Sequence, residues 1–118
     1  MNSPSDAPLV AIVTPVYNGA RFIGEALESV QNLDYPNLVH VVLDNACTDG
    51  TDEIIRQYMG RRVPVVTKRN PSTLPIIENW NAAVAMVPPE AKYFHLLCAD
   101  DTFRPDAISI RVAIAEKD

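Results

Sequence analysis

The sequence Leu96-Leu97-Cys98-Ala99-Asp100-Asp101 places two adjacent carboxylates directly after an apolar run that begins at Tyr93. Residues 93–98 carry almost no polar groups, which predicts a buried strand of a parallel sheet that is covered on both faces. The two acids then lie at the carboxyl end of that strand, where open α/β sheets bind their ligands. Neighbouring carboxylates repel each other, and a hard divalent cation such as Mg²⁺ or Mn²⁺ relieves that repulsion.

The same acid pair also fits a purely structural interpretation. Asp101-Thr102 precedes a helical pattern that starts at Pro105, and aspartate is a favoured residue at a helix N-cap. The six quoted residues support a helix cap and a metal site equally, so the rest of the chain has to distinguish them.

Composition limits the classes of protein to which the chain can belong. It has 118 residues, 47% of them hydrophobic, which fits one globular domain with a modest core. A net charge of −5 argues against a broad nucleic-acid-binding surface. The start of the chain has no signal segment and no apolar run is long enough to span a membrane, so we expect a cytoplasmic location. Residues 1–8 are polar and rich in proline and serine, which predicts a flexible tail before a domain at 9–118.

Apolar runs alternate with helical patterns four times along the domain. No hairpin signal separates the runs, so the alternation predicts a four-stranded, mostly parallel sheet with helices packed on it, an α/β layered fold. The expected strands cover 9–14, 38–43, 63–67 and 93–98, and the expected helices cover 20–33, 51–58, 76–87 and 105–117. Pro15 is expected to end the first strand.

Polar groups follow three of the four expected strands. Parallel strands end on the same edge of a sheet, so these groups are expected to meet at one rim, where an aromatic ring and carboxylates suit a nucleotide and a metal-bound diphosphate. The chain lacks both the GxGxxG pattern and the Walker pattern, so a metal would have to hold the phosphates. The converging residues are Tyr17, Asn18, Asp44, Asn45, Asp100 and Asp101.

Four motifs in register resemble the inverting family 2 glycosyltransferases, which have the GT-A fold. They are VAIVTPVYN at 10–18, VLDNACTDGT at 42–51, NWNAA at 79–83, and LCADD at 97–101 followed by Pro105-Asp106. The resemblance covers about residues 9–110 and implies a Rossmann-like, partial GT-A domain that binds a nucleotide-diphospho-sugar. It also implies transfer of the sugar to the hydroxyl of a glycan or other acceptor, with Mn²⁺ or Mg²⁺ as the cofactor.

The resemblance also implies roles for individual residues. Pro15 and Tyr17 would flank the nucleotide base, with Asn18 beside them in the same loop. Asp44, together with Asn45, would hydrogen-bond the edge of the base, and residues 68–70 would lie near the base or the phosphates.

The last motif is expected to hold the metal and the donor. Asp100 would face the ribose or the metal, and Asp101 would complete the contact between the metal and the diphosphate. The catalytic base is not identified, because the chain ends at Asp118, before the part in which the family places its acceptor site.

Two positions depart from the usual motifs of the family. Asn45 replaces a second acid, and an amide donates hydrogen bonds as well as accepting them. Cys98 stands where another acid often begins the metal motif, which predicts a lower metal affinity or little preference between Mn²⁺ and Mg²⁺.

Other interpretations stay open. The chain could be a non-catalytic nucleotide-binding or oligomerising module, in which a homodimer covers an apolar face. Tyr17 could simply pack over the end of the sheet, and Asp44 could only shape a turn. We expect Trp80 to lie in the core, and we expect both histidines, His40 and His95, to be structural because they lie within strands.

Overall fold

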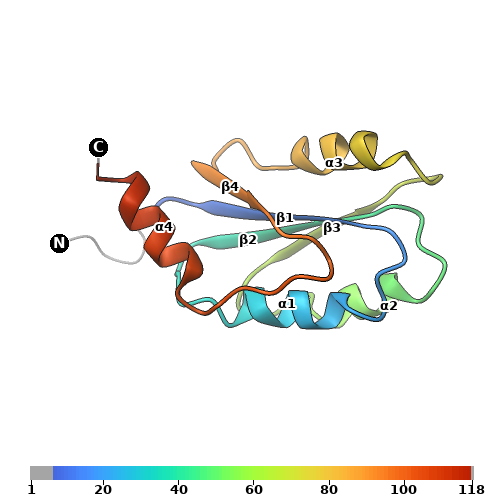
Figure 1. Ribbon diagram of the computed structural model, residues 1–118, viewed down its shortest axis with the longest axis horizontal. Helices are drawn as coiled ribbons and strands as arrows, with labels where there is room; N and C mark the ends of the chain where they lie inside the picture. Colours follow the sequence, from blue (N-terminus) through green and yellow to red (C-terminus); the bar gives the residue numbers. More distant parts are fainter. Residues whose placement is uncertain (1–6, 118) are drawn as a thin grey trace.

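The computed structural model describes residues 7–117 and consists of one parallel sheet with helices around it (Figure 1). The four strands have the order β3-β2-β1-β4, and all three neighbouring pairs are parallel. The predicted α/β layered fold is therefore confirmed, while most of the expected tail (residues 1–6) lies outside the described residues. The elements are β1 (Val10–Val16), α1 (Ile23–Gln31), β2 (Leu38–Asp44), α2 (Thr51–Arg56), β3 (Val65–Arg69), α3 (Ile76–Val84), β4 (Tyr93–Leu96) and α4 (Ala107–Ala115).

The two faces of the sheet are covered by different helices (Figure 1). Alternate residues of β1 show this, because Ile12 packs in a cluster with Ala26 of α1 whereas Val13 packs with Ala83 of α3. The short helix α4 lies at the amino end of the strands, where Ile108 joins the cluster on the α1 side. Every helix among residues 7–117 is too short or too polar to cross a bilayer.

Pro15 does not end the first strand as predicted, since β1 continues to Val16. The backbone of Val13 faces β4, because its carbonyl accepts a hydrogen bond from the Leu97 N–H at 2.9 Å. Pro15, two residues later, faces the same side, where β4 has already ended. The missing N–H of the proline therefore breaks no bond with β2 on the other side.

Strand β4 is not buried on both faces, which corrects the prediction for residues 93–98. It pairs only with β1 and ends at Leu96, and it forms one edge of the sheet. The side chains of Phe94 and Leu96, on the face that α3 partly covers, are 51% and 36% exposed. An apolar run indicates a strand, but it does not show on how many sides the strand has neighbours.

Two further predictions were wrong in detail. Helix α3 buries Asn79 and Ala83, and it leaves Trp80 38% exposed instead of placing it in the core. Strand β3 begins at Val65 rather than at Val63, and the Gln31 side chain of α1 bonds to both the N–H and the carbonyl of Val63. The buried Asn79 thus takes the core position that the apolar pattern suggested for Trp80, whereas Val63 stays in the core although it lies outside the strand.

Candidate functional site at the carboxyl edge of the sheet

The candidate site lies at the carboxyl edge of the sheet, where the loops that follow β1, β2 and β4 come together (Figure 1). The chain adds β2 and β3 on one side of β1 and then returns to add β4 on the other side. The connections thus change direction between β1 and β4, and a change of this kind opens a crevice at the strand ends.

The loops after β1 and β2 are joined by direct hydrogen bonds. Asn18 has a positive φ of 50°, donates its N–H to the Sγ of Cys47 at 3.1 Å and accepts from the N–H of Thr48 at 2.8 Å. The Gly19 N–H donates to the hydroxyl of Thr51 at 3.0 Å. The side chain of Asn18 is therefore used to shape the rim as well as being exposed on it.

Asp49, in the loop after β2, also ties this loop to the loop after β1. Its carboxylate accepts hydrogen bonds from the N–H of Ala20 and from both the N–H and the hydroxyl of Thr51. These bonds, chiefly the one from the Thr51 hydroxyl, lower the pKa of Asp49 below its usual value. Asp49 is thus a structural residue that shapes the turn at 48–51.

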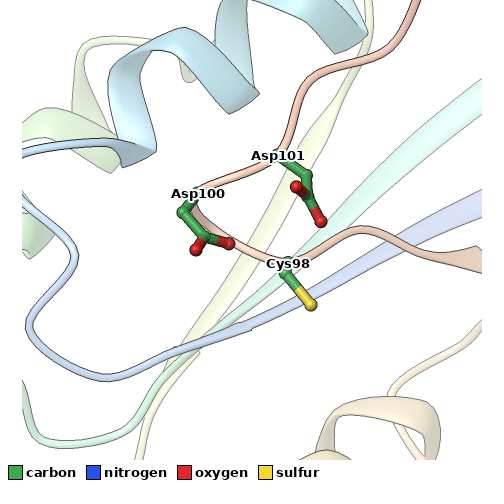
Figure 2. A group of neighbouring side chains, drawn as sticks. All are labelled: Cys98, Asp100 and Asp101. Atoms are coloured by element: carbon green, nitrogen blue, oxygen red, sulfur yellow. The ribbon is translucent and has the colours of Figure 1, made fainter.

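The two adjacent acids lie on the loop that leaves β4, together with Cys98 (Figure 2). Ligand atoms of Cys98, Asp100 and Asp101 lie within 4.8 Å of one another, and both aspartates are exposed. Helix α4 begins only at Ala107 with Asp106 at its N-cap, so neither member of the acid pair caps it. The cap interpretation is therefore wrong, and the acid pair remains free for a ligand.

The chemistry of this cluster fits a hard divalent cation better than a soft one. Burial, with smaller contributions from the charges of Asp101 and Asp100, raises the pKa of the Cys98 thiol. A thiol that keeps its proton is a poor ligand, whereas two exposed carboxylates are the usual protein contribution to a magnesium site that also uses water and phosphate oxygens.

Asp44 ends β2 and is buried beneath an arginine. Its side chain is 3% exposed and accepts from the N–H of Cys47 at 2.8 Å and from Nη1 of Arg69 at 3.0 Å. The other Nη of Arg69 donates to the carbonyl of Cys47 at 2.7 Å. Asp44 and Arg69 line a hollow of about 190 Å³ on the α2 side of the sheet. The Arg69 side chain, 49% exposed, is the part of this pair that faces solvent.

The remaining predicted site residues differ in their surroundings. Tyr17 is 56% exposed at the rim, so it does not simply pack over the sheet. Pro15 is buried within β1, on the face that α3 covers. Asn45 is 3% exposed, and both the nitrogen and the oxygen of its amide are bonded within the protein. Its partners include Asn70 and Leu74, which sequence reasoning missed because nothing but the polar residues after each strand pointed to them.

Both histidines lie within strands, as predicted. His40 is buried in β2 and shares a hydrogen bond of 2.7 Å with the hydroxyl of Thr14. His95 lies 2.9 Å from an Arg111 nitrogen of α4 and stacks edge-on against Phe103. Neither ring lies on the loops of the carboxyl edge.

The comparison with known families agrees with this geometry. The family described as Glycosyl transferase family 2 matches residues 11–118. The chain belongs to glycosyl transferase family 2. The predicted family is therefore confirmed, and the Rossmann-like fold described above is the GT-A fold.

Relatives of this family 2 chain include two named bacterial enzymes. It is 31% identical to the "Putative teichuronic acid biosynthesis glycosyltransferase TuaG" of Bacillus subtilis over 107 residues, which are 86% of the chain and 39% of TuaG. It is 30% identical to the "Abequosyltransferase RfbV" of Salmonella typhimurium over 105 residues, 86% of the chain and 31% of RfbV. The chain thus spans well under half of either relative.

Two solved structures share the fold of the family 2 chain. The structure of S. aureus TarS 1–349 in complex with UDP has a TM-score of 0.83 and 21% identity, and covers 92% of this chain and 32% of TarS 1–349. The mannosyltransferase PcManGT from Pyrobaculum calidifontis, in complex with GDP-Man and Mn²⁺, has a TM-score of 0.78 and 24% identity, and covers 97% of this chain and 33% of PcManGT.

Proposed function

We propose that this family 2 chain is the donor-binding part of an enzyme that transfers a sugar from a nucleotide-diphospho-sugar to an acceptor hydroxyl. The observation that carries the proposal is the pair of exposed carboxylates at the carboxyl edge, beside the point where the strand connections change direction. Neighbouring folds solved with UDP or with GDP-Man and Mn²⁺ support a ligand of this class.

Asp100 and Asp101 would hold the divalent cation, Mn²⁺ or Mg²⁺, through their oxygens. When bound, such an ion neutralises the charge that develops on the leaving diphosphate. Asp100 would also face the ribose, and Asp101 would complete the contact with the diphosphate. The loop of Asn18 and Gly19, which is tied to the β2 loop by hydrogen bonds, would hold its backbone beside the donor.

The nucleoside would lie on the β2 side of this crevice. The exposed ring of Tyr17 would stack on the base, and buried Pro15 would support it from within β1. Asp44 would recognise the base edge together with Arg69, whose side chain is half exposed. Asn45 completes the set of nucleotide-site residues, although its bonds within the protein point to an indirect role.

In the proposed reaction the bond between the anomeric carbon and the diphosphate oxygen breaks, and a bond to the acceptor oxygen forms. The electron pair of the broken bond leaves with the nucleoside diphosphate, and the hydroxyl proton goes to a base. A homodimer stays a prediction, which sedimentation of the chain would test.

Titration calorimetry with UDP, GDP and dTDP, each with and without Mn²⁺, tests the donor site. We expect one of the three to bind in a metal-dependent way and to lose that binding in Asp101→Asn. Asp34→Asn is the matched control, because it removes the same charge from an exposed residue between α1 and β2, at the amino end of the strands. If none of the three nucleotides binds, the proposed function is wrong.

An activity assay distinguishes the proposed enzyme from a non-catalytic binding module. Release of nucleoside diphosphate from the matching sugar donor, with or without an acceptor, would show turnover by this chain. If a longer protein that contains the chain binds the donor in a metal-dependent way but shows no turnover, the non-catalytic binding module is favoured instead.

A further inference from the structure

Three asparagine side chains form a buried cluster directly behind the candidate nucleoside site. Asn45 follows β2, Asn70 follows β3 and Asn79 lies in α3, and they are 3%, 6% and 4% exposed. The amide nitrogen of Asn70 donates to the side-chain oxygen of Asn45 at 2.9 Å and to that of Asn79 at 3.0 Å. The cluster therefore joins the ends of two strands to the helix on the opposite face of the sheet from α2.

Asn45 uses both ends of its amide on one residue of the segment that connects β3 to α3. The Leu74 N–H donates to the side-chain oxygen of Asn45 at 2.8 Å, and the Asn45 side-chain nitrogen donates to the Leu74 carbonyl at 2.9 Å. The side chain thus pairs with Leu74 as a neighbouring strand would. Thr73 adds a weaker bond, from its hydroxyl to the Asn45 carbonyl at 3.4 Å.

Only an amide can make this pair of bonds. An aspartate at position 45 would keep the bond from the Leu74 N–H but could not donate to the Leu74 carbonyl, and it would place a charged oxygen against that carbonyl. A buried acceptor facing another acceptor is costly. This contact gives a physical reason for an amide at a position where the family often has an acid.

The cluster also lies directly after the two residues that line the hollow, at the end of the β2–β3 pairing. Asp44 and Arg69 are partners in the β2–β3 register, and the next N–H along, that of Asn70, donates to the Asp44 carbonyl at 2.9 Å. Asn45 and Asn70 are the residues immediately after this pair. A change in the cluster would therefore shift the two residues that face the nucleoside.

We infer that Asn45 is a positioning residue for nucleotide recognition, which acts through Leu74 and Asn70 to hold Asp44 and Arg69 in register. This inference rests on the proposed function. It assigns Asn45 to the support of the nucleoside site, and it leaves the metal-diphosphate loop after β4 independent of the amide cluster.

The test compares two probes in the variant Asn45→Asp. We expect its affinity for the nucleoside diphosphate that binds the wild type, with Mn²⁺ present, to fall by about tenfold, whereas its affinity for pyrophosphate with Mn²⁺ changes by less than about twofold. A variant that was simply less stable would lose both affinities together. Asn81→Asp is the matched control, because it makes the same change at an exposed position of α3 and should leave both affinities unchanged.

A variant that keeps the wild-type affinity for both probes would overturn the inference, and so would an equal loss of both. Failure of the wild type to bind any nucleoside diphosphate would instead contradict the proposed function.

Hydrogen exchange on the wild type covers the case in which Asn45→Asp does not fold. The Leu74 amide should exchange at least about tenfold more slowly than that of exposed Ser72 in the same segment, because it is bonded to Asn45. Equal exchange rates would show that the hydrogen bonds between Asn45 and Leu74 are not formed, which would also overturn the inference.

Discussion

Gly19 packs directly against Ala99, so closely that a Cβ built on the glycine would lie 3.3 Å from the Cβ of Ala99. The same Cβ would lie only 2.6 Å from a methyl group of Val16, which is buried and β-branched and has little freedom to move. The contact brings the loop after β1 against the loop that carries the acid pair. A side chain at Gly19 would therefore clash with Val16 and press against Ala99.

Gly19→Ala should therefore destabilise the protein by about 1–3 kcal/mol through overpacking. Gly24→Ala is the matched control, because a Cβ at Gly24 in α1 would make an ordinary 3.8 Å contact with Ile54. In a helix that change should be neutral or stabilising by up to about 1 kcal/mol. Urea unfolding of both variants measures the difference, and equal effects would contradict the close packing at Gly19.

Stability should depend on pH through His40. Burial lowers the pKa of His40 to about 3, while an unfolded histidine titrates near 6.5. Between these values the unfolded state binds the proton and the folded state does not, so stability falls as pH decreases, by at most about 1.4 kcal/mol per pH unit from this group.

His40→Gln should flatten that part of the profile, because it removes the titrating ring and keeps a group that can share a hydrogen bond with Thr14. Urea unfolding of both proteins at pH 7, 6, 5 and 4 gives the two slopes. Parallel slopes would show that His40 is not buried in its neutral form.

The contact between Arg69 and Asp44 should contribute to stability. Arg69→Met leaves a buried carboxylate without its cation, and we expect a loss of about 1–2 kcal/mol, less than for a fully buried pair because the arginine is half exposed. A double-mutant cycle with Asp44→Asn should give a coupling of about 1 kcal/mol.

Arg56→Met is the control for this cycle. Arg56 makes an exposed pair with Asp52 at 3.3 Å, and its loss should cost no more than about 0.5 kcal/mol. A coupling near zero between Arg69 and Asp44 would mean that the guanidinium does not rest on the carboxylate in solution.

Metal affinity should respond to the residue at position 98. Cys98→Asp adds a third carboxylate to the cluster and should raise the affinity for Mn²⁺ by about tenfold, since more charged oxygen ligands bind a hard cation more tightly. Cys98→Ser, which adds a neutral hydroxyl, should produce no such increase. Calorimetry with Mn²⁺ alone compares the three proteins, and equal affinities would show that the ion binds elsewhere.

The alternation of apolar runs and helical patterns was enough to predict the parallel sheet, because each element buries a face with its own period. It was not enough to predict the extent of burial. Phe94, Leu96 and Trp80 look like core residues in a short window of sequence, and they are partly exposed because β4 has one neighbour and α3 buries its amide side.

For the site, the sequence correctly indicated which loops carry polar groups, and the sheet brings those loops to one edge. It could not indicate which polar atoms are already bonded within the protein. Asn45 and Asp44 are adjacent and both polar, yet one is committed to Leu74 and the other to Arg69, which are distant in sequence. Such pairings depend on where the chain returns, and only the folded structure contains that information.

Pro15 of β1 limits the length over which β4 can pair with β1. If the register Val13↔Leu96 continued, the N–H of residue 15 would meet the carbonyl of Leu97, and proline has no N–H to offer. The chain that follows β4 therefore leaves the sheet just before Cys98, and the carboxylates of Asp100 and Asp101 lie beyond the end of the sheet. A protein engineer who grafts this acidic loop onto another parallel sheet would therefore have to transfer the proline on the adjacent strand as well.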